Sequence, residues 1–474
     1  MKSDVIVVGS GIVGLACAWA AWQQGKRVRV IDRDPFCVGA SIRNFGFVTV
    51  TGQGAGDTWR RARRSRDVWA QLAPQAGIAI EHQGLYVLAQ RQQAKVVLQE
   101  LCTRPEGQDL QWLEGQDLQD RAPHLTMAHL LGALYSPHEL RIEARLAIDK
   151  LRHWLAQQGV EFQMGQAVQE VISGAVLSGG QWQQAERIVV CPGPDIRSLF
   201  PAAFAQNSTQ LCQLQMLRVQ PPDGYKLGAG VMSDLSLVRY RGYSELPGAQ
   251  LLHDQLRVEC RQALDHGIHL IIVQSADGSL VVGDSHHYGQ AMRPFASREV
   301  EDLILHEMQR LLCLGHYQVT ERWTGIYPSA QQDTLVREVL PNVQLVSVTS
   351  GTGMSTAFGL AEAGLAQRVQ GFLEAGLQLC HFLGAGSGRA VRLARRGQAG
   401  QAGHEVLVHA LCAPPFQQQA QEPEDEQAGD QPPAHGGAAQ WLVGLDEDEG
   451  ADEPDEQAQG HQAQKLQHVA VEQP

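Results

Sequence analysis

The stretch Asp4-Val-Ile-Val-Val-Gly-Ser-Gly-Ile-Val-Gly14 decides the fold of the N-terminal part of the chain. Residues 4–8 form the short apolar run of a buried strand, 12–24 have helical character, and 28–31 read as a second strand. A strand, a glycine turn, a helix and a second strand in this order predict a βαβ unit in a doubly wound α/β fold.

The glycine spacing in this stretch is the pattern of a dinucleotide-binding turn. Gly9 permits the tight turn, Gly11 lets the backbone approach a pyrophosphate, and Gly14 lets helix and strand pack closely. Asp32 ends the second strand, where a carboxylate can bind a ribose diol. The predicted cofactor-binding residues here are Gly9, Ser10, Gly11, Ile12, Val13, Gly14, Asp32 and Arg33. The alternative is a chance glycine loop in an ordinary α/β fold.

Charge is distributed unevenly along the 474 residues, which have room for two or three domains. The formal net charge is -13, but residues 401–474 hold 15 acidic residues against one basic one, which leaves 36 acidic and 37 basic residues in 1–400. No general nucleic-acid binder is expected, because that role needs a basic face. Residues 383–403 are rich in Gly, Ala and Arg, and residues 417–474 have few apolar side chains. Residues 377–474 are therefore predicted to form a disordered, low-complexity tail, which is regulatory, inert or a translated out-of-frame end.

The nine cysteines are scattered, without a CxxC pair or a Cys/His ligand spacing. We therefore expect reduced thiols, a cytoplasmic location and no metal site. The apolar run 5–22 could pass for a signal peptide, but glycines break it and a strand follows directly, so its cleavage would destroy the βαβ unit. No other run approaches the length of a membrane span.

Three further segments carry a family resemblance: Gly39-Ala-Ser-Ile-Arg-Asn-Phe-Gly46, Arg187-Ile-Val-Val-Cys-Pro-Gly193, and residues 341–359, where a strand leads into Gly351-Thr-Gly-Met-Ser355. Together with the first turn they resemble the FAD-dependent amine oxidoreductases of the D-amino-acid oxidase, glycine oxidase and sarcosine oxidase superfamily. The stretches Leu214-Gln-Met-Leu-Arg218 and Gly283-Asp-Ser-His-His-Tyr288 most resemble a subgroup associated with aminophosphonate breakdown. The resemblance covers about residues 3–374 and is most specific at both ends. It implies a Rossmann-like FAD-binding domain of the glutathione-reductase type, interleaved with a β-rich substrate domain.

The resemblance also implies which residues surround the cofactor. Its implied contacts to the flavin, the pyrophosphate and the adenine side are Ser41, Arg43, Asn44, Gly46, Gly193, Gly351, Gly353, Met354 and Ser355. A surface cation is the alternative for Arg43. The FAD should be non-covalent, because the segment 317–333 lacks the cysteine that links flavin in some sarcosine oxidases.

The resemblance divides the chain into discontinuous domains. The FAD-binding domain is expected at 1–80, 140–212 and 315–376, and the substrate domain at 81–139 and 213–314. Residues 211–290 read as β-rich, with one of the strands at 235–240.

Substrate contacts are expected from two segments that border the cavity in the family. Gly283-Asp-Ser-His-His-Tyr288 supplies His286, His287 and Tyr288 for substrate contact or proton handling, although adjacent histidines on a strand face opposite ways. Arg322-Trp-Thr-Gly-Ile-Tyr-Pro328 has Tyr327 where the family pattern has an arginine that holds a substrate carboxylate. This difference argues against an ordinary α-amino acid as the substrate.

Another anion clamp is therefore needed, and arginines can supply it. Arg239 and Arg241 share one face of the expected strand and predict such a clamp, with Arg322 as a further candidate. The alternative is a solvent-exposed charged edge.

The expected function is FAD-dependent oxidation of the C–N bond of a small amine, followed by imine hydrolysis. The amine is an amino acid, an N-methylated amine or an aminophosphonate, and the acceptor is dioxygen or an electron carrier. One alternative is an FAD-dependent dehydrogenase of a hydroxy acid or of a substrate like glycerol-3-phosphate. Another is a non-catalytic or tRNA-modifying flavoprotein, for which the run 59–66 is the main basic cluster; on a helix such a run is more often a solvated face.

Overall fold

Five parallel strands form the sheet that the N-terminal motif predicts. The computed structural model describes residues 3–364. The strand order is β7 (Glu161–Met164), β2 (Val28–Asp32), β1 (Ser3–Val8), β10 (Gln181–Val190) and β17 (Val343–Ser350). The predicted α/β fold class is confirmed, with the first two strands and α1 (Ile12–Gln23) close to their expected positions.

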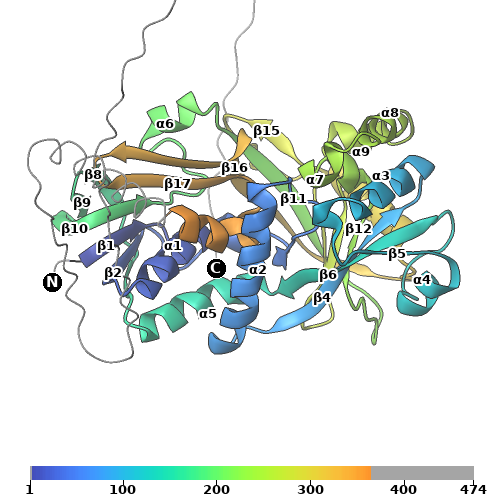
Figure 1. Ribbon diagram of the computed structural model, residues 1–474, viewed down its shortest axis with the longest axis horizontal. Helices are drawn as coiled ribbons and strands as arrows, with labels where there is room; N and C mark the ends of the chain where they lie inside the picture. Colours follow the sequence, from blue (N-terminus) through green and yellow to red (C-terminus); the bar gives the residue numbers. More distant parts are fainter. Residues whose placement is uncertain (1–2, 365–474) are drawn as a thin grey trace, which may run out of the picture. The chain divides into compact units, whose positions relative to one another are not determined.

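Both faces of this sheet are covered by other elements. Successive side chains of a strand point to opposite faces, so alternate residues of β1 belong to two different hydrophobic clusters. Val5 and Val7 pack into a cluster with α1, α2 (Asp57–Gln75), α5 (Ala144–Gln157) and the helix that starts at 353. Ile6 and Val8 pack against β8 (Val168–Ile172), β9 (Ala175–Ser178) and α6 (Pro201–Gln206) on the other face. Figure 1 shows α1, α2 and α5 together beside the parallel strands, away from α6.

A second, mostly antiparallel sheet holds the largest hydrophobic cluster. Its order is β11 (Gln210–Gln220), β14 (Leu280–Gly283), β13 (Ile271–Gln274), β12 (Gly230–Met232), β4 (Ile80–Ala89), β6 (Gly132–Ile142) and β5 (Gln111–Leu113). Short β3 (Phe47–Val48) and β15 (His287–Gly289) pair with β6 and β11. Helices α3 (Gln92–Cys102), α8 (Ala249–Glu259) and α10 (Arg298–Leu311) pack their apolar faces into the same cluster.

One long strand joins the two sheets. β16 (Gln318–Leu340) pairs with β11 through its first half and with β17 through its second half. The described part of the chain belongs to one compact unit. The predicted division into an FAD-binding and a substrate domain stays a prediction, and the predicted tail, 377–474, lies outside the described residues.

The expected strand at 235–240 is wrong. Residues Asp234–Val238 form a 3₁₀ helix, η3, and α7 (Arg241–Ser244), α8 and α9 (Arg261–Asp265) follow it. The turn is fixed by tertiary contacts, because the buried Asp234 carboxylate accepts a 2.8 Å bond from Arg91. The apolar side chains of this alternating pattern, Leu235 and Leu237, are buried by a tight helical turn rather than by an extended strand.

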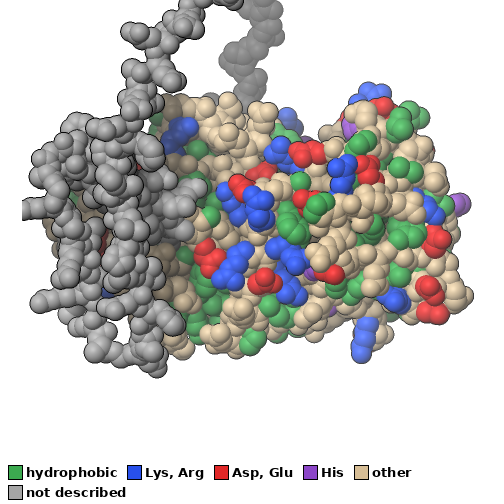
Figure 2. Space-filling model, viewed as in Figure 1, with side chains coloured by type: hydrophobic (Ala, Val, Ile, Leu, Met, Phe, Trp, Pro, Cys, Tyr) green, Lys and Arg blue, Asp and Glu red, His purple; other side chains and the backbone are tan. Residues whose placement is uncertain are grey.

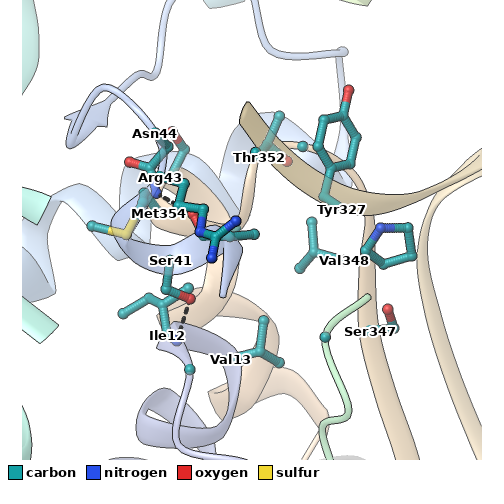
Figure 3. A pocket seen from close by; sticks show the side chains of 18 of the residues that line it. Ile12, Val13, Ser41, Arg43, Asn44, Tyr327, Ser347, Val348, Thr352 and Met354 are labelled. Carbon is teal, nitrogen blue, oxygen red and sulfur yellow. Dashed lines mark hydrogen bonds between the residues drawn. The ribbon is translucent and has the colours of Figure 1, made fainter. Parts of the chain in front are cut away.

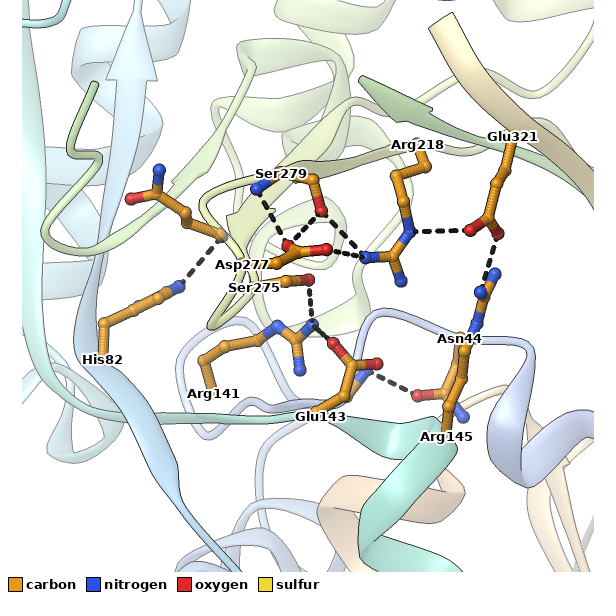
Figure 4. Close-up of polar contacts among 12 residues, drawn as sticks. Asn44, His82, Arg141, Glu143, Arg145, Arg218, Ser275, Asp277, Ser279 and Glu321 are labelled. Carbon is orange, nitrogen blue, oxygen red and sulfur yellow. Dashed lines mark hydrogen bonds and ion pairs between the residues drawn. The ribbon is translucent and has the colours of Figure 1, made fainter. Parts of the chain in front are cut away.

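A buried polar network crosses between the two cores (Figure 4). Arg141 at the end of β6 donates to Glu143 at 3.0 Å and to the Ser275 hydroxyl, which follows β13, at 3.1 Å. Arg218 of β11 donates to the Ser279 hydroxyl at 2.8 Å. These contacts tie the start of α5 to the β13–β14 turn.

The basic run on α2 is largely neutralised. Arg60, Arg64 and Arg66 form ion pairs with Asp57, Glu362 and Asp67. Figure 2 shows Lys and Arg side chains interspersed with Asp and Glu over this face. Among residues 3–364, no helix combines the length and the apolar character that a membrane crossing needs.

Candidate active site

A cavity of about 1070 Å³ lies where the N-terminus of α1, the loop 39–45 and the end of β17 meet (Figure 3). The predicted cofactor residues that line it are Gly11, Ile12, Val13, Gly14, Ser41, Arg43, Asn44, Gly193, Gly351, Gly353, Met354 and Ser355. Segments far apart in the sequence therefore converge on one space.

The first glycine turn admits no side chain at two positions. Gly9 has φ +103°, and a Cβ there would lie 2.2 Å from the Cys191 carbonyl oxygen. A Cβ on Gly14 would lie 1.9 Å from the Gly9 carbonyl oxygen. The start of α1 is open to the cavity, and Ile12 N–H donates to the Ser41 hydroxyl at 3.0 Å. The N–H groups of a helix start favour an anion.

Three predicted residues near the end of β2 lie outside the cavity lining. Ser10 donates from its backbone N–H and its hydroxyl to Asp32 Oδ2, at 2.6 and 2.8 Å. Arg33 pairs with Asp195 at 2.9 Å. Ser10 thus fixes the Asp32 carboxylate, and the ribose contact of Asp32 stays a prediction.

The loop after β2 places a guanidinium in the cavity. Arg43 extends between Ser41 and Met354 in Figure 3. Its side chain donates to the Thr324 carbonyl at 3.4 Å, and no carboxylate of the described residues lies within 4.0 Å of it. Gly46 does not line the cavity; its φ is +61°, and a Cβ there would lie 1.9 Å from the Ile142 carbonyl oxygen. The close packing explains why a glycine stands here, and its predicted flavin contact stays a prediction.

A second helix start faces the same cavity. The helix from 353 follows Gly351, which has φ +75° and lies against the Tyr327 ring. Ser355 is buried and accepts a 2.9 Å bond from Thr49 N–H. Two helix starts and Arg43 surround one space, which fits a cofactor with a pyrophosphate and a flavin that becomes negative on reduction.

A second cavity of about 1120 Å³ adjoins the first. Both are lined by Asn44, Phe45, Leu214, Tyr240, Tyr327, Gly351 and Thr352. The second adds the ionisable side chains of Arg239, Arg241, His269, Asp284, His286 and Asp333.

Arg239 presents its charge to the second cavity. It follows η3 and donates to the hydroxyls of Tyr288 at 2.6 Å and Tyr327 at 3.0 Å. Burial opposes its charge, but these two tyrosines favour it and the pKa of Arg239 is raised. No carboxylate of the described residues lies within 4.0 Å of it.

The strand expected to carry the paired clamp is wrong, because Arg239 follows η3 and Arg241 starts α7. Both side chains line the second cavity, and their role as a clamp stays a prediction. Arg241 starts α7 and pairs with Glu245 at 2.8 Å and with Asp333 at 3.3 Å. Arg322 lies outside both cavities and makes two bonds to Glu301, at 2.6 and 2.7 Å. Of the three predicted arginines, Arg239 alone has no carboxylate partner within 4.0 Å among the described residues.

His286 and His287 point to different surroundings, as expected for neighbours. His286 is buried in the second cavity, and its Nδ1 lies 2.9 Å from the Gly267 carbonyl oxygen. His287 is exposed, outside both cavities, with its Nε2 3.1 Å from His266 Nδ1. Tyr288 reaches the site only through Arg239.

His286 belongs to a buried cluster that the sequence does not reveal as a whole. His269 Nε2 lies 3.1 Å from Asp284 Oδ1, and His286 Nε2 lies 3.7 Å from Asp284 Oδ2. The two imidazoles stack with centroids 4.6 Å apart. Burial raises the pKa of Asp284 to about 7 and lowers the pKa values of both histidines. The Gly-Asp-Ser-His stretch points to Asp284, but only the pairing of β13 with β14 brings in His269.

The comparisons with known proteins agree with this cofactor cavity. The model of the family "DAO: FAD dependent oxidoreductase" matches residues 4–367. The chain therefore belongs to this family of FAD-dependent oxidoreductases. The resemblance seen in the sequence is thus confirmed at the level of the family, while the aminophosphonate subgroup is not.

Individual relatives are distant. An opine oxidase subunit of Rhizobium meliloti is 25% identical over 218 residues, which is 42% of this chain and 58% of the relative. The match thus spans little more than half of the relative. Glycine oxidase from Bacillus cereus has a TM-score of 0.62 at 17% identity, over 78% of this chain and 95% of that chain. L-alpha-glycerophosphate oxidase from Mycoplasma pneumoniae has a TM-score of 0.58 at 14% sequence identity, over 77% of this chain and 94% of that chain. These two structures show the fold alone.

Proposed function

We propose that the protein oxidises the C–N bond of a small amine that carries an anionic group. The observation that supports this most directly is Arg239, a guanidinium without a carboxylate partner among the described residues, beside the cofactor cavity. A guanidinium in a partly enclosed cavity binds carboxylates and phosphonates strongly.

The position of Arg239 accounts for the departure of this chain from the family pattern. Tyr327 stands where the pattern has an arginine, and its hydroxyl accepts a 3.0 Å bond from Arg239. A guanidinium therefore reaches the same cavity from η3 instead of from β16. This supports a carboxylate or phosphonate substrate despite the missing arginine.

The residues of the chain would bind the cofactor and the substrate and orient them toward each other. FAD supplies the hydride acceptor, and the glycine turn of α1, Arg43 and the helix start at 353 would hold it. Arg239 would hold the substrate anion, so that the amine lies toward the wall shared with the cofactor cavity. An N-methylated amine, an amino acid and an aminophosphonate all have this anion–amine arrangement. The curated relative and one solved structure are named as an opine oxidase subunit and a glycine oxidase.

A second candidate is oxidation of a hydroxy acid or a polyol phosphate. The glycerophosphate oxidase shares the fold, and a guanidinium binds phosphate as well as carboxylate. We also propose dioxygen or an electron carrier as acceptor, a small-molecule substrate rather than nucleic acid, and a cytoplasmic location, which the seven free thiols of the described residues favour.

The test is an anaerobic titration of the FAD-loaded protein with the visible flavin spectrum as readout. Sarcosine, aminoethylphosphonate, N-methyl-aminoethylphosphonate and glycerol-3-phosphate are added separately. Bleaching by an amine, with release of a smaller amine or ammonia, supports the proposal. Bleaching by glycerol-3-phosphate alone overturns it in favour of the second candidate.

A further inference from the structure

The cluster of His269, Asp284 and His286 lies in the wall of the proposed substrate cavity. All three side chains are buried, and their ligand atoms lie within 4.8 Å of one another. Asp284 Oδ1 and His269 Nδ1 have no hydrogen-bond partner that meets ordinary geometry, although both are buried. Buried polar atoms left in this state are costly and point to a proton that moves or to a bound group.

The elements around the cluster contribute one permanent charge. The Tyr240 ring meets His269 edge-on at 5.1 Å, the Tyr327 ring lies 6.4 Å from His286, and the Gly267 carbonyl fixes His286 Nδ1. The imidazole of His287 on β15 also lowers the pKa of His286 electrostatically, and the Asp284 carboxyl raises the pKa of the Cys212 thiol on β11 after burial. The charge of Arg239 opposes proton binding at all three members: after burial it further lowers the pKa of both histidines, and it offsets part of the rise that burial causes at Asp284.

An anion bound at Arg239 would cancel this influence. The proton affinity of a site rises when a neighbouring positive charge is neutralised. The same event that places the substrate anion would therefore prepare the cluster to take up a proton.

We propose that the His269–Asp284–His286 cluster is a proton acceptor that anion binding at Arg239 switches on. The inference rests on the proposed function, because an amine must lose a proton before it can give up hydride. In that step an N–H bond of the substrate ammonium breaks, nitrogen keeps the electron pair, and the proton goes to the cluster. The proton returns to water when the anion leaves and the charge of Arg239 is exposed again.

A proton suits this cluster better than a metal ion. His269 Nε2 and Asp284 Oδ1 lie 3.1 Å apart, within reach of a hydrogen bond although their present angle is outside its ordinary range. A divalent cation would also add charge beside a guanidinium that has no carboxylate partner within 4.0 Å among residues 3–364.

The test measures protons rather than turnover. The FAD-loaded protein is titrated with acetate by calorimetry at one pH near 8, in two buffers of different ionisation enthalpy. The buffer dependence of the heat gives the number of protons taken up per acetate. We expect a large part of one proton for the parent protein and for Asp57→Asn, a carboxylate change on α2 outside both cavities. We expect Asp284→Asn and His286→Gln to bind acetate with almost none.

A second measurement does not depend on any variant. Proton uptake makes the acetate Kd weaken by up to about tenfold per pH unit above the pKa of the cluster. A Kd that is constant from pH 7 to 9, together with heats that do not depend on the buffer, overturns the inference. So does a stoichiometric metal ion in the parent protein that His286→Gln loses. If amines bleach the flavin while acetate takes up no proton, only the inference fails. If no amine bleaches it, the proposed function fails independently of the calorimetry.

Discussion

Arg239 owes its place in the site to the turn that ends at Val238. The side chains at 239 and 241 share a face if the chain is extended, but the 3₁₀ turn sends Arg239 toward Tyr327 and Arg241 toward Asp333. Among the described residues, Arg239 is thereby left without a carboxylate within 4.0 Å, whereas Arg241 forms ion pairs with Glu245 and Asp333. The difference between two arginines two residues apart gives a direct test of the substrate site.

Arg239→Met should weaken binding of a carboxylate or phosphonate substrate by about 10- to 100-fold, the value of one or two charge-assisted hydrogen bonds. Arg241→Met is the matched control and should change the Kd less than about threefold, because its charge is already paired. The Kd is read from the perturbation of the flavin spectrum by a non-oxidised anion. Equal effects of the two substitutions would contradict the assignment.

Asp284 should make stability depend on pH with an unusual sign. Its pKa is raised to about 7 in the fold, whereas an unfolded chain has the ordinary value near 4. Between about pH 4 and 7 the unfolded state releases this proton first, so the free energy of unfolding falls as pH rises. The Asp284→Asn variant lacks that fall and should gain stability relative to the parent by about 2–4 kcal/mol across this range. Urea unfolding at saturating FAD and several pH values measures the difference; a difference that does not change with pH would count against a buried carboxyl.

The predictability of the site differs from residue to residue. The glycines at 9, 11 and 14 and the acid at 32 can be recognised in the sequence because the cofactor fixes their spacing within one βαβ unit. His269 and Asp284 cannot be recognised as a pair, because strand register in the antiparallel sheet decides their contact. The ion pair of Arg322 cannot be recognised for a similar reason, since its partner Glu301 comes from α10.

The turn between β1 and α1 allows a prediction about an element as a whole. A Cβ at Gly14 would meet the Gly9 carbonyl oxygen at 1.9 Å, so Gly14→Ala must push α1 away from β1. We expect a loss of about 3 kcal/mol or more in the free energy of unfolding of the apoprotein, and a loss of FAD retention on gel filtration. Gly39→Ala is the control, since that position has negative φ and open space around its Cβ. Retention of FAD by Gly14→Ala would show that helix and strand can separate without cost to the site.

Elements that depend on distant partners are the ones that sequence reasoning misses. The first 32 residues have local signals, and the strand, helix and second strand expected there coincide with β1, α1 and β2. β16 is not recognisable as a 23-residue strand, because its first half pairs with β11 and its second half pairs with β17. The expectation of a β-rich segment fails over residues 234–265. The helical turn at the start of this segment is fixed by a hydrogen bond from Arg91, far away in the sequence, to Asp234.

The molecule as a whole depends on how its two cores are joined. The cluster around the parallel sheet and the cluster around the antiparallel sheet are built from different residues, and the cavities lie where both contribute walls. The Arg141 network is a place where buried charge bridges them. Loss of these hydrogen bonds should therefore lower the free energy of unfolding and change the shape of the two cavities.

Glu143→Gln leaves Arg141 as a buried guanidinium without its carboxylate, because the two side chains lie 3.0 Å apart and Arg141 is 1% exposed. Removing one partner of a buried ion pair costs about 3–5 kcal/mol, and the partial exposure of Glu143 places the expected loss near the lower value. Asp57→Asn breaks the exposed pair with Arg60 and should cost less than about 1 kcal/mol. Urea unfolding of both variants measures the difference. If Glu143→Gln proves as mild as Asp57→Asn, the network is not what couples the two cores, and the packing of β16 across both sheets must do so alone.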